Sequence, residues 1–446
     1  MAEPHDLCVT EAAAAIRAHD LSPVELVQSL LDRIEALEPQ LVAWATLVPE
    51  QALAAAREAE RHAGPESPVH GVPFGAKDIF DTAGIRTEAG SKIWAGRVPE
   101  NDAASVALLK DSSAVLLGKT HTTEFADGDP APCRNPWDAA HTPGGSSTGS
   151  AVAVAARMVP FALGSQTVGS VLRPAAYNGI VGLKPTFGRV SRLGVAPLAD
   201  SFDHVGVLTR TVADAAAVLD VLAGYDDADP DSAEEPVDAY SAALGTGGPP
   251  RIGLVRTWFA DLSDAETRLT MEDVAQELAR AGADVHEVDP GIDFGDAYAH
   301  HRVMMETETA VTHAELFTGN EHLYGSKLTD YIRRGQAHAA TAYVAAAAFR
   351  RRMQALARAA FERVDVLLMP TASGPAPRDL TSTGDTRFQS AWSYTGFPSI
   401  TVPVGLASNG LPLGMQLAAA PFEEAKLLRV AHWAEQALGV RLSPPV

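Results

Sequence analysis

Hydrophobic residues near the start of the chain recur with the period of an α-helix. Ser22-Pro23-Val24-Glu25 has the form of a capping box, with proline at the first helical position. Apolar residues follow at helical spacing: Leu26, Val27, Leu30, Leu31, Ile34 and Leu37. Because this spacing places them on one face, we predict an amphipathic helix that begins after Ser22 and ends at Pro39.

From about residue 70 the pattern changes to short apolar runs, separated by loops of Gly, Pro and Ser and by Ala-rich segments. The runs predict strands at 71–76, 114–117, 180–183, 251–255, 283–288, 364–369, 400–404 and 414–417. Helices are predicted at 50–62, 264–281 and 427–438. This alternation indicates an α/β protein with a largely buried sheet.

Two segments depart from the alternation. Residues 226–250 are acidic and rich in Pro and Gly, which predicts an exposed connection. Residues 296–362 are Ala-rich with little β character, which predicts a mostly helical region.

Charge and composition exclude several classes of function. The 446 residues include 35 Lys and Arg against 56 Asp and Glu, a net charge of −21. Such a surface is poorly suited to nucleic acid or to an anionic membrane. No apolar run reaches the ~18 residues of a membrane span. The two cysteines, Cys8 and Cys133, form no disulfide framework or zinc motif, so we expect a cytoplasmic protein without metal or cofactor.

Two clusters of Gly and Ser carry the strongest chemical signal. They are TPGGSSTGS, from Thr142, and SQTVGS, at 165–170, with an Ala-rich stretch between them. Such loops can direct several N–H groups at one developing oxyanion. The first cluster also matches the G-x-S-x-G nucleophile elbow around Ser147. A loop rather than a buried strand precedes Ser147, which disfavours a Ser-His-Asp site there.

Lys77 is the second candidate. It ends the apolar, Gly-rich run GVPFGAK. Burial disfavours the charged form of a lysine, so a buried Lys77 could act as a base. Composition alone favours an ion pair with the adjacent Asp78 instead, and the residues leave both interpretations open.

Seven blocks in the same order make the chain similar to the amidase signature family of Ser-cisSer-Lys hydrolases. They lie at 71–84, 116–126, 143–155, 163–195, 203–216, 395–405 and 411–417. The resemblance implies an α/β amidase-signature fold with a mixed central sheet covered by helices on both faces. It implies one domain over 1–446, with a catalytic core at about 60–255 and 362–446. The helical segment at about 296–361 is the variable part that covers the core.

The resemblance also implies the roles of individual residues. Ser170 would be the acylated nucleophile, Ser146 the bridging serine after a cis peptide bond, and Lys77 the neutral base. Four backbone N–H groups would form the oxyanion hole: Thr167, Val168, Gly169 and Ser170. The expected reaction is hydrolysis of C–N bonds of amides or of carbamates (urethanes), with ester cleavage as a side activity.

The sequence departs from the family near the nucleophile and says little about the substrate. Many members have Asp-x-Gly-Gly-Ser where this chain has QTVGS, so Gln166 removes a charge beside the site. Asp127, Gly128 and Gln166 are the candidate substrate-binding residues. The loop 126–137 has Arg134 as its only cation, so we expect a neutral or apolar small-molecule substrate. Four residues of the helical segment are candidates to cover the site: Met304, Met305, Tyr324 and Tyr331.

Two alternatives remain. The A-type subunit of tRNA-dependent amidotransferases has the same catalytic residues and works with partner proteins and tRNA. This chain has SQTVGSVLRP where that subunit has SDTGGSIRQP, and its charge of −21 disfavours an RNA partner. The other alternative is a catalytically idle binding homologue. A homodimer is expected from the resemblance alone.

Overall fold

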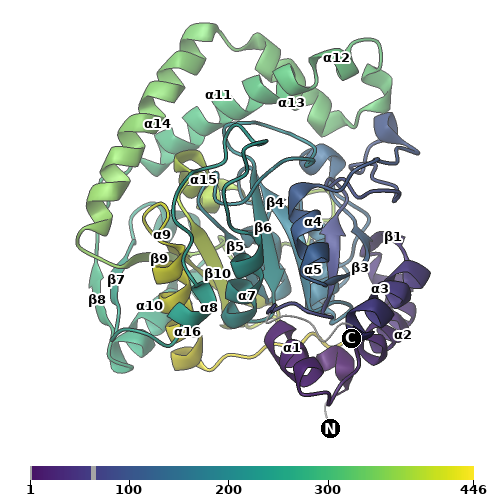
Figure 1. The fold of residues 1–446 in the computed structure, drawn as a ribbon. Coiled ribbons are helices and arrows are strands. Elements are labelled where there is room, and N and C mark those ends of the chain that lie inside the picture. The colour runs from purple at the N-terminus through teal and green to yellow at the C-terminus, as the bar shows by residue number, and fades with distance from the viewer. Residues whose placement is uncertain (1–2, 62–66) are drawn as a thin grey trace.

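An 11-stranded sheet runs through the computed structural model, which describes residues 3–61 and 67–446. Its strand order is β1-β3-β2-β4-β6-β5-β10-β11-β9-β7-β8 (Figure 1). The strands are β1 (Trp44–Leu47), β2 (Pro73–Lys77), β3 (Val115–Thr120), β4 (Phe161–Gln166), β5 (Val181–Lys184), β6 (His204–Thr209), β7 (Arg251–Leu254), β8 (Asp284–Glu287), β9 (Val366–Pro370), β10 (Ser399–Leu406) and β11 (Pro412–Ala418).

The sheet is mixed, and its parallel part positions the site. β2 pairs in parallel with both β3 and β4, and β7 with β8 and β9, whereas the strands between β4 and β9 are antiparallel. Ala76 of β2 lies opposite Leu163 of β4. Because parallel strands end at the same sheet edge, Lys77 and the residues around Gln166 meet there.

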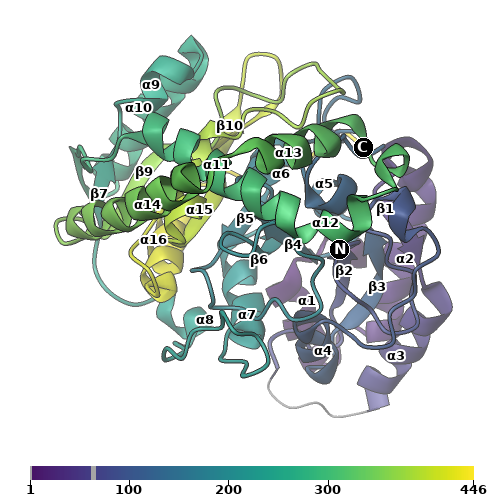
Figure 2. The ribbon, with the colours of Figure 1, turned by 90° about the horizontal axis from the view of Figure 1, so that it is seen from above.

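Helices cover both faces of the sheet. On one face, α7 (Val212–Leu222) contacts both α4 (Ala104–Asp111) and α16 (Glu424–Leu438). On the other, α5 (Thr148–Ala155) contacts α6 (Leu172–Asn178) (Figure 2). Every residue of α5 is buried, which an apolar helix in the core requires. The predicted fold class is confirmed. Both predicted core segments contribute strands to this one sheet, and the single domain stays a prediction.

The N-terminal helices are α1 (Val9–Arg17), α2 (Pro23–Leu41) and α3 (Pro49–Arg61). The predicted capping box is present, because Ser22 Oγ accepts from Val24 N at 3.0 Å and Glu25 Oε2 from Ser22 N at 3.0 Å. The predicted end at Pro39 is wrong, since α2 continues to Leu41. The Glu38 carboxylate fixes that end by accepting the N–H groups of Ala43 and Trp44, each at 2.9 Å. Residue 62 of the second predicted helix lies outside the described residues.

The predicted helical segment forms a layer over one end of the sheet (Figures 1 and 2). It comprises α11 (Phe294–Thr312), α12 (Ala314–Phe317), α13 (Ser326–Ala337) and α14 (Ala340–Phe361). α11 contacts α13, α14 and also α15 (Arg387–Thr395), which connects this layer to the core. The remaining α-helices are α8 (Tyr240–Ala243), α9 (Phe259–Leu262) and α10 (Ala265–Arg280).

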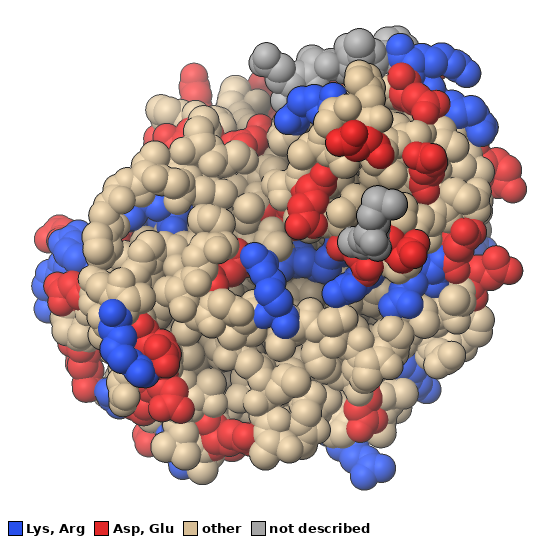
Figure 3. Space-filling model, turned by 90° about the horizontal axis from the view of Figure 1, so that it is seen from below, with Lys and Arg blue, Asp and Glu red and all other residues tan. Residues whose placement is uncertain are grey.

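The acidic connection at 226–250 is largely irregular, as predicted, but two of its carboxylates hold it to the core. Asp226 Oδ2 accepts from Ser191 Oγ at 2.5 Å, and Asp229 Oδ2 accepts from Arg192 N at 2.8 Å. On the face shown in Figure 3, acidic and basic side chains lie side by side. Among the described helices, none combines the length and apolarity needed to cross a membrane.

Gly335→Ala is expected to destabilise the protein by roughly 1–3 kcal/mol, through overpacking. A Cβ at Gly335 would lie 1.8 Å from the backbone oxygen of Glu306, so α13 would have to move away from α11. Helix propensity alone predicts the opposite sign, because alanine is favoured over glycine within a helix. Urea unfolding measures the change. The control is Gly245→Ala, since no atom lies within 4 Å of the added carbon; equal stability of the two variants would contradict the close approach.

Candidate active site

Lys77 ends β2 in a fully buried position and touches two serines. Its Nζ donates to Ser146 Oγ at 2.6 Å and to Ser165 Oγ at 2.8 Å. Burial lowers the pKa of Lys77 well below its ordinary value, and the more distant carboxylates of Asp203 and Asp127 oppose that shift. Burial thus favours the neutral form of the amine, which is the form that can accept a proton.

The ion pair between Lys77 and Asp78 that composition favours is not formed. Asp78 lies instead 3.6 Å from Lys119 Nζ, a second buried lysine. Lys119 also donates to Thr87 Oγ1 at 2.7 Å and to the carbonyl oxygen of Phe80 at 2.5 Å. Asp78 thus forms an ion pair with Lys119. Among the described residues, no carboxylate forms an ion pair with Lys77.

The loop before α5 presents Ser146 to Lys77. The Gly145–Ser146 peptide bond is cis, and Gly144 has a φ of +77°. Arg173 Nη2 donates to the carbonyl oxygen of Gly145 at 2.7 Å and to Thr383 Oγ1 at 3.1 Å. A buried arginine therefore holds the peptide group that immediately precedes Ser146.

Ser170 lies in the turn that joins β4 to α6. Ser147 N donates to the carbonyl oxygen of Ser170 at 3.2 Å, which ties the two Gly/Ser clusters together. Gln166 Oε1 accepts from the N–H groups of Val171 and Leu172 at 2.9 and 3.0 Å. Within the described residues no acceptor is found for the N–H groups of residues 167–170. These donors remain available to a substrate oxygen.

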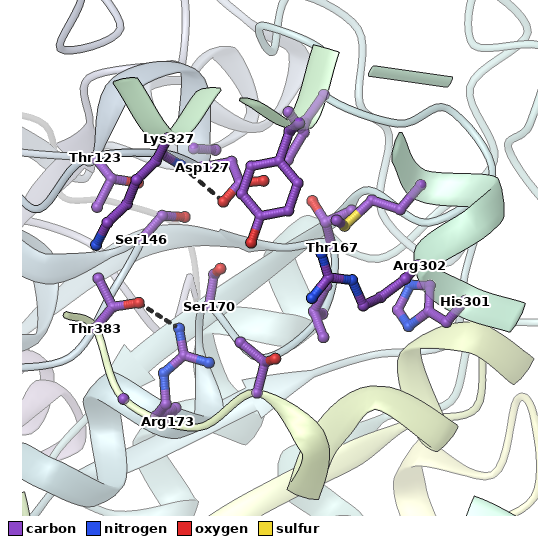
Figure 4. Close-up of a pocket in the computed structure, with 18 of the residues that line it drawn as sticks. Thr123, Asp127, Ser146, Thr167, Ser170, Arg173, His301, Arg302, Lys327 and Thr383 are labelled. Atoms are coloured by element: carbon purple, nitrogen blue, oxygen red, sulfur yellow. Dashed lines mark hydrogen bonds between the residues drawn. The ribbon is translucent and has the colours of Figure 1, made fainter. Parts of the chain in front are cut away.

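A cavity of about 240 Å³ brings most of the expected residues together (Figure 4). Ser146 and Ser170 line it, as do Asp127 and Gly128. Gln166 is not among the described lining residues: its Oε1 accepts from the turn that carries Ser170, and its Nε2 donates to Ser393 Oγ of α15 at 3.1 Å. Thr167 and Val168 of the proposed oxyanion hole are also among the lining residues.

The cavity is more strongly cationic than the loop 126–137 alone suggests. Arg134 is absent from its described lining, which instead includes Arg173, Arg302 and Lys327. Asp127 is the only carboxylate among the described lining residues. Burial raises the pKa of Asp127 to about 6. The N–H of Gly128, which donates to Asp127 Oδ1 at 2.8 Å, partly opposes this shift because it stabilises the carboxylate.

The helical segment covers the cavity with part of the expected set. Met305 and Tyr331 line it, whereas Met304 and Tyr324 pack elsewhere. Tyr324 stacks on Phe125, with ring centroids 6.1 Å apart. Three further lining residues of α11 are not predicted from the sequence: Tyr298, His301 and Arg302. No local motif marks them, because their position depends on how α11 packs.

The nucleophile-elbow interpretation of Ser147 is not supported. Its side chain is fully buried, and its Oγ contacts the backbone N–H and C=O of Ser165, each at 3.2 Å. Ser147 is therefore a structural link between the first cluster and β4.

Comparison with known proteins places this geometry in a family. A family model described as Amidase matches residues 25–428. The chain belongs to the amidase family. The curated relatives include the A-type subunit of glutamyl-tRNA(Gln) amidotransferase from Geobacter sp. (strain M21), 38% identical over 96% of this chain and 97% of the relative. The corresponding protein from Methylococcus capsulatus is 37% identical over 97% of each chain.

Solved structures of the family share the whole fold. The peptide amidase of Stenotrophomonas maltophilia is 34% identical, with a TM-score of 0.85 and 98% of each chain covered. The 6-aminohexanoate cyclic dimer hydrolase is 26% identical, with a TM-score of 0.88 over 100% of this chain and 99% of the other. A chain from a vestigial protein complex related to the origins of an s-triazine catabolic enzyme is 30% identical, with a TM-score of 0.91 over 98% of this chain and 99% of the other.

Proposed function

We propose that this amidase-family chain cleaves C–N bonds of amides by transferring the acyl group to Ser170. The observation that carries the proposal is the 2.6 Å contact between Lys77 Nζ and Ser146 Oγ, at a cavity that Ser170 also lines. A buried amine bonded to one serine hydroxyl, with a second serine lining the same cavity, supports an activated-nucleophile arrangement.

The proton and the electron pairs move in a closed cycle. Ser170 Oγ attacks the amide carbon while its proton passes to Ser146 Oγ, whose own proton passes to Lys77 Nζ. The N–H groups of residues 167–170 hold the resulting oxyanion. When the C–N bond breaks, the relay returns the proton to the leaving nitrogen. Water then attacks the acyl-enzyme by the same relay and releases the acid and free Ser170.

Carbamates and esters undergo the same steps, so they belong to the proposal as further substrates. Asp127 and Gly128 are proposed to contact the substrate, because both line the cavity. A small-molecule substrate, a homodimer and a cytoplasmic location remain predictions.

The curated relatives support a second candidate function. These A-type chains are 36–38% identical over nearly the full length of this chain, and their name describes one subunit of an amidotransferase for glutamyl-tRNA(Gln). In that role, the chain would react at Ser170 but turn over amides only with a partner chain. Its net charge of −21 does not favour direct contact with tRNA.

A hydrolysis panel tests the proposal and separates the two candidates. The panel contains an anilide, a short aliphatic amide, an aryl carbamate and a simple ester. Purified wild type is expected to cleave at least one C–N substrate, and Ser170→Ala is expected to lose that activity. Ser147→Ala, which removes the other candidate nucleophile, is the matched control. An inert wild type that still acylates Ser170 would favour the amidotransferase role, and absence of acylation would favour the idle homologue.

The rate is expected to fall as the pH drops through the depressed pKa of Lys77. Burial lowers that pKa, so Lys77 keeps its neutral form to lower pH than an exposed lysine does, and protonation in acid removes the base. The measurement is kcat/KM against pH. Asp127→Asn is the control, because Asp127 also titrates in acid, with a pKa of about 6. The fall of kcat/KM at low pH should remain in this variant if it comes from Lys77. A profile that stays flat down to about pH 5 would contradict the lysine base.

Ser165→Ala is expected to lower kcat by roughly 10- to 100-fold, because it removes one of the two groups that fix the Lys77 amine. Unfolding in urea should change much less than the rate. The control is Ser150→Ala, which removes a buried hydroxyl bonded to Leu163 O at 2.9 Å and not to Lys77. Similar rate losses in the two variants would show that Ser165 has no special role.

A further inference from the structure

Arg302 of α11 is held in place by the buried carboxylate of Glu306, one turn further along the same helix. Its Nη2 donates to Glu306 Oε1 at 2.5 Å. Glu306 also accepts from Arg334 Nε at 2.9 Å and contacts His338 Nε2 at 2.9 Å. The Glu306 side chain is only 3% exposed. One carboxylate thus faces two guanidinium groups, so this cluster of Arg302, Glu306 and Arg334 has a net positive charge.

The guanidinium of Arg302 faces the reaction cavity. Its side chain keeps 36% of its surface exposed, and Figure 4 shows it reaching into the space beside Thr167. It lies 5.9 and 5.7 Å from the ring centroids of Tyr298 and Tyr331, which restrict it on α11 and α13. An arginine fixed by a carboxylate and two rings is preorganised to bind a planar anion.

Two other cations share the lining with Arg302. Arg173 Nη2 donates to Gly145 and Thr383, which fixes this guanidinium beside the Gly145–Ser146 peptide bond, while its buried Nε and Nη1 have no partner among the described residues. Lys327 Nζ donates to the carbonyl oxygen of Thr381. Asp127 is the only opposing carboxylate among the described lining residues. The cavity is therefore positive inside a chain whose net charge is −21, and a recess of one sign attracts the opposite charge.

We propose that the site takes an amide that carries a carboxylate, and that Arg302 binds this carboxylate away from the scissile bond. The inference rests on the proposed function and narrows its substrate from amides in general to anionic amides. Arg302 is thereby a specificity-determining residue supplied by the helical segment.

Binding to the Ser170→Ala protein tests the inference without turnover. Calorimetry compares succinanilate with butyranilide, two anilides that differ by a carboxylate on the acyl side. A second pair, 4-acetamidobenzoate and acetanilide, places the carboxylate on the leaving-group side. We expect one carboxylate to bind roughly 10- to 100-fold more tightly than its neutral partner, as charge-assisted hydrogen bonds predict. The pair that shows the preference identifies the side.

Arg302→Gln in the same background should abolish the preference and leave the neutral anilides unchanged. Arg334→Gln is the matched control, because Arg334 binds the same Glu306 but is absent from the described lining. Arg302→Lys should keep part of the preference and make it sensitive to salt. Equal binding within both pairs, or equal losses in Arg302→Gln and Arg334→Gln, would overturn the inference. Failure of turnover in the wild type would instead count against the proposed function, since binding is measured separately.

Discussion

The buried amine of Lys77, shared between two serine hydroxyls, is the interaction on which the rest of the site depends. Burial without an adjacent counter-ion lowers the pKa of the Lys77 amine and favours its neutral form, which makes this lysine a candidate base. Its nitrogen must still be aimed, and Ser146 and Ser165 do this at 2.6 and 2.8 Å. A carboxylate close to Lys77 would raise its pKa and favour the protonated amine. Asp78 lies beside Lys119 instead. The carboxylate that is adjacent in sequence therefore pairs with Lys119 and not with Lys77.

The sheet explains how residues so distant in sequence reach one another. β2 delivers Lys77, and its parallel neighbour β4 delivers Ser165 at the same edge. The turn after β4 then carries Ser170, and Gln166 fixes that turn through the N–H groups of Val171 and Leu172. The core thus fixes the reacting groups, whereas α11 and α13 supply much of the remaining wall. The cavity is thus lined both by residues of the core and by residues of the helical segment.

The residues expected at the core site lie in compact local motifs. Lys77 contacts Ser146, and Ser146 lines one cavity with Ser170, while their catalytic roles stay predictions. Strong helical periodicity likewise identifies α2, although Pro39 does not end it. The strand β4 is missed, since its last residues, Gly164 to Gln166, resemble a polar loop until pairing with β2 and β6 buries them. Arg302 is missed for another reason: its place in the cavity depends on the packing of α11 against α13, which no local pattern encodes. A neutral pocket is the natural expectation when only the loop around Arg134 is considered.

The most direct test of the central claim is the site and rate of modification by a serine-reactive fluorophosphonate, followed by mass spectrometry of the digested protein. A single adduct is expected on Ser170, and it should form rapidly in the wild type. Lys77→Met keeps a long, buried side chain but removes the base, and the same adduct should then form far more slowly. An adduct on Ser147, or an unchanged rate in Lys77→Met, would contradict the claim that a neutral Lys77 activates Ser170.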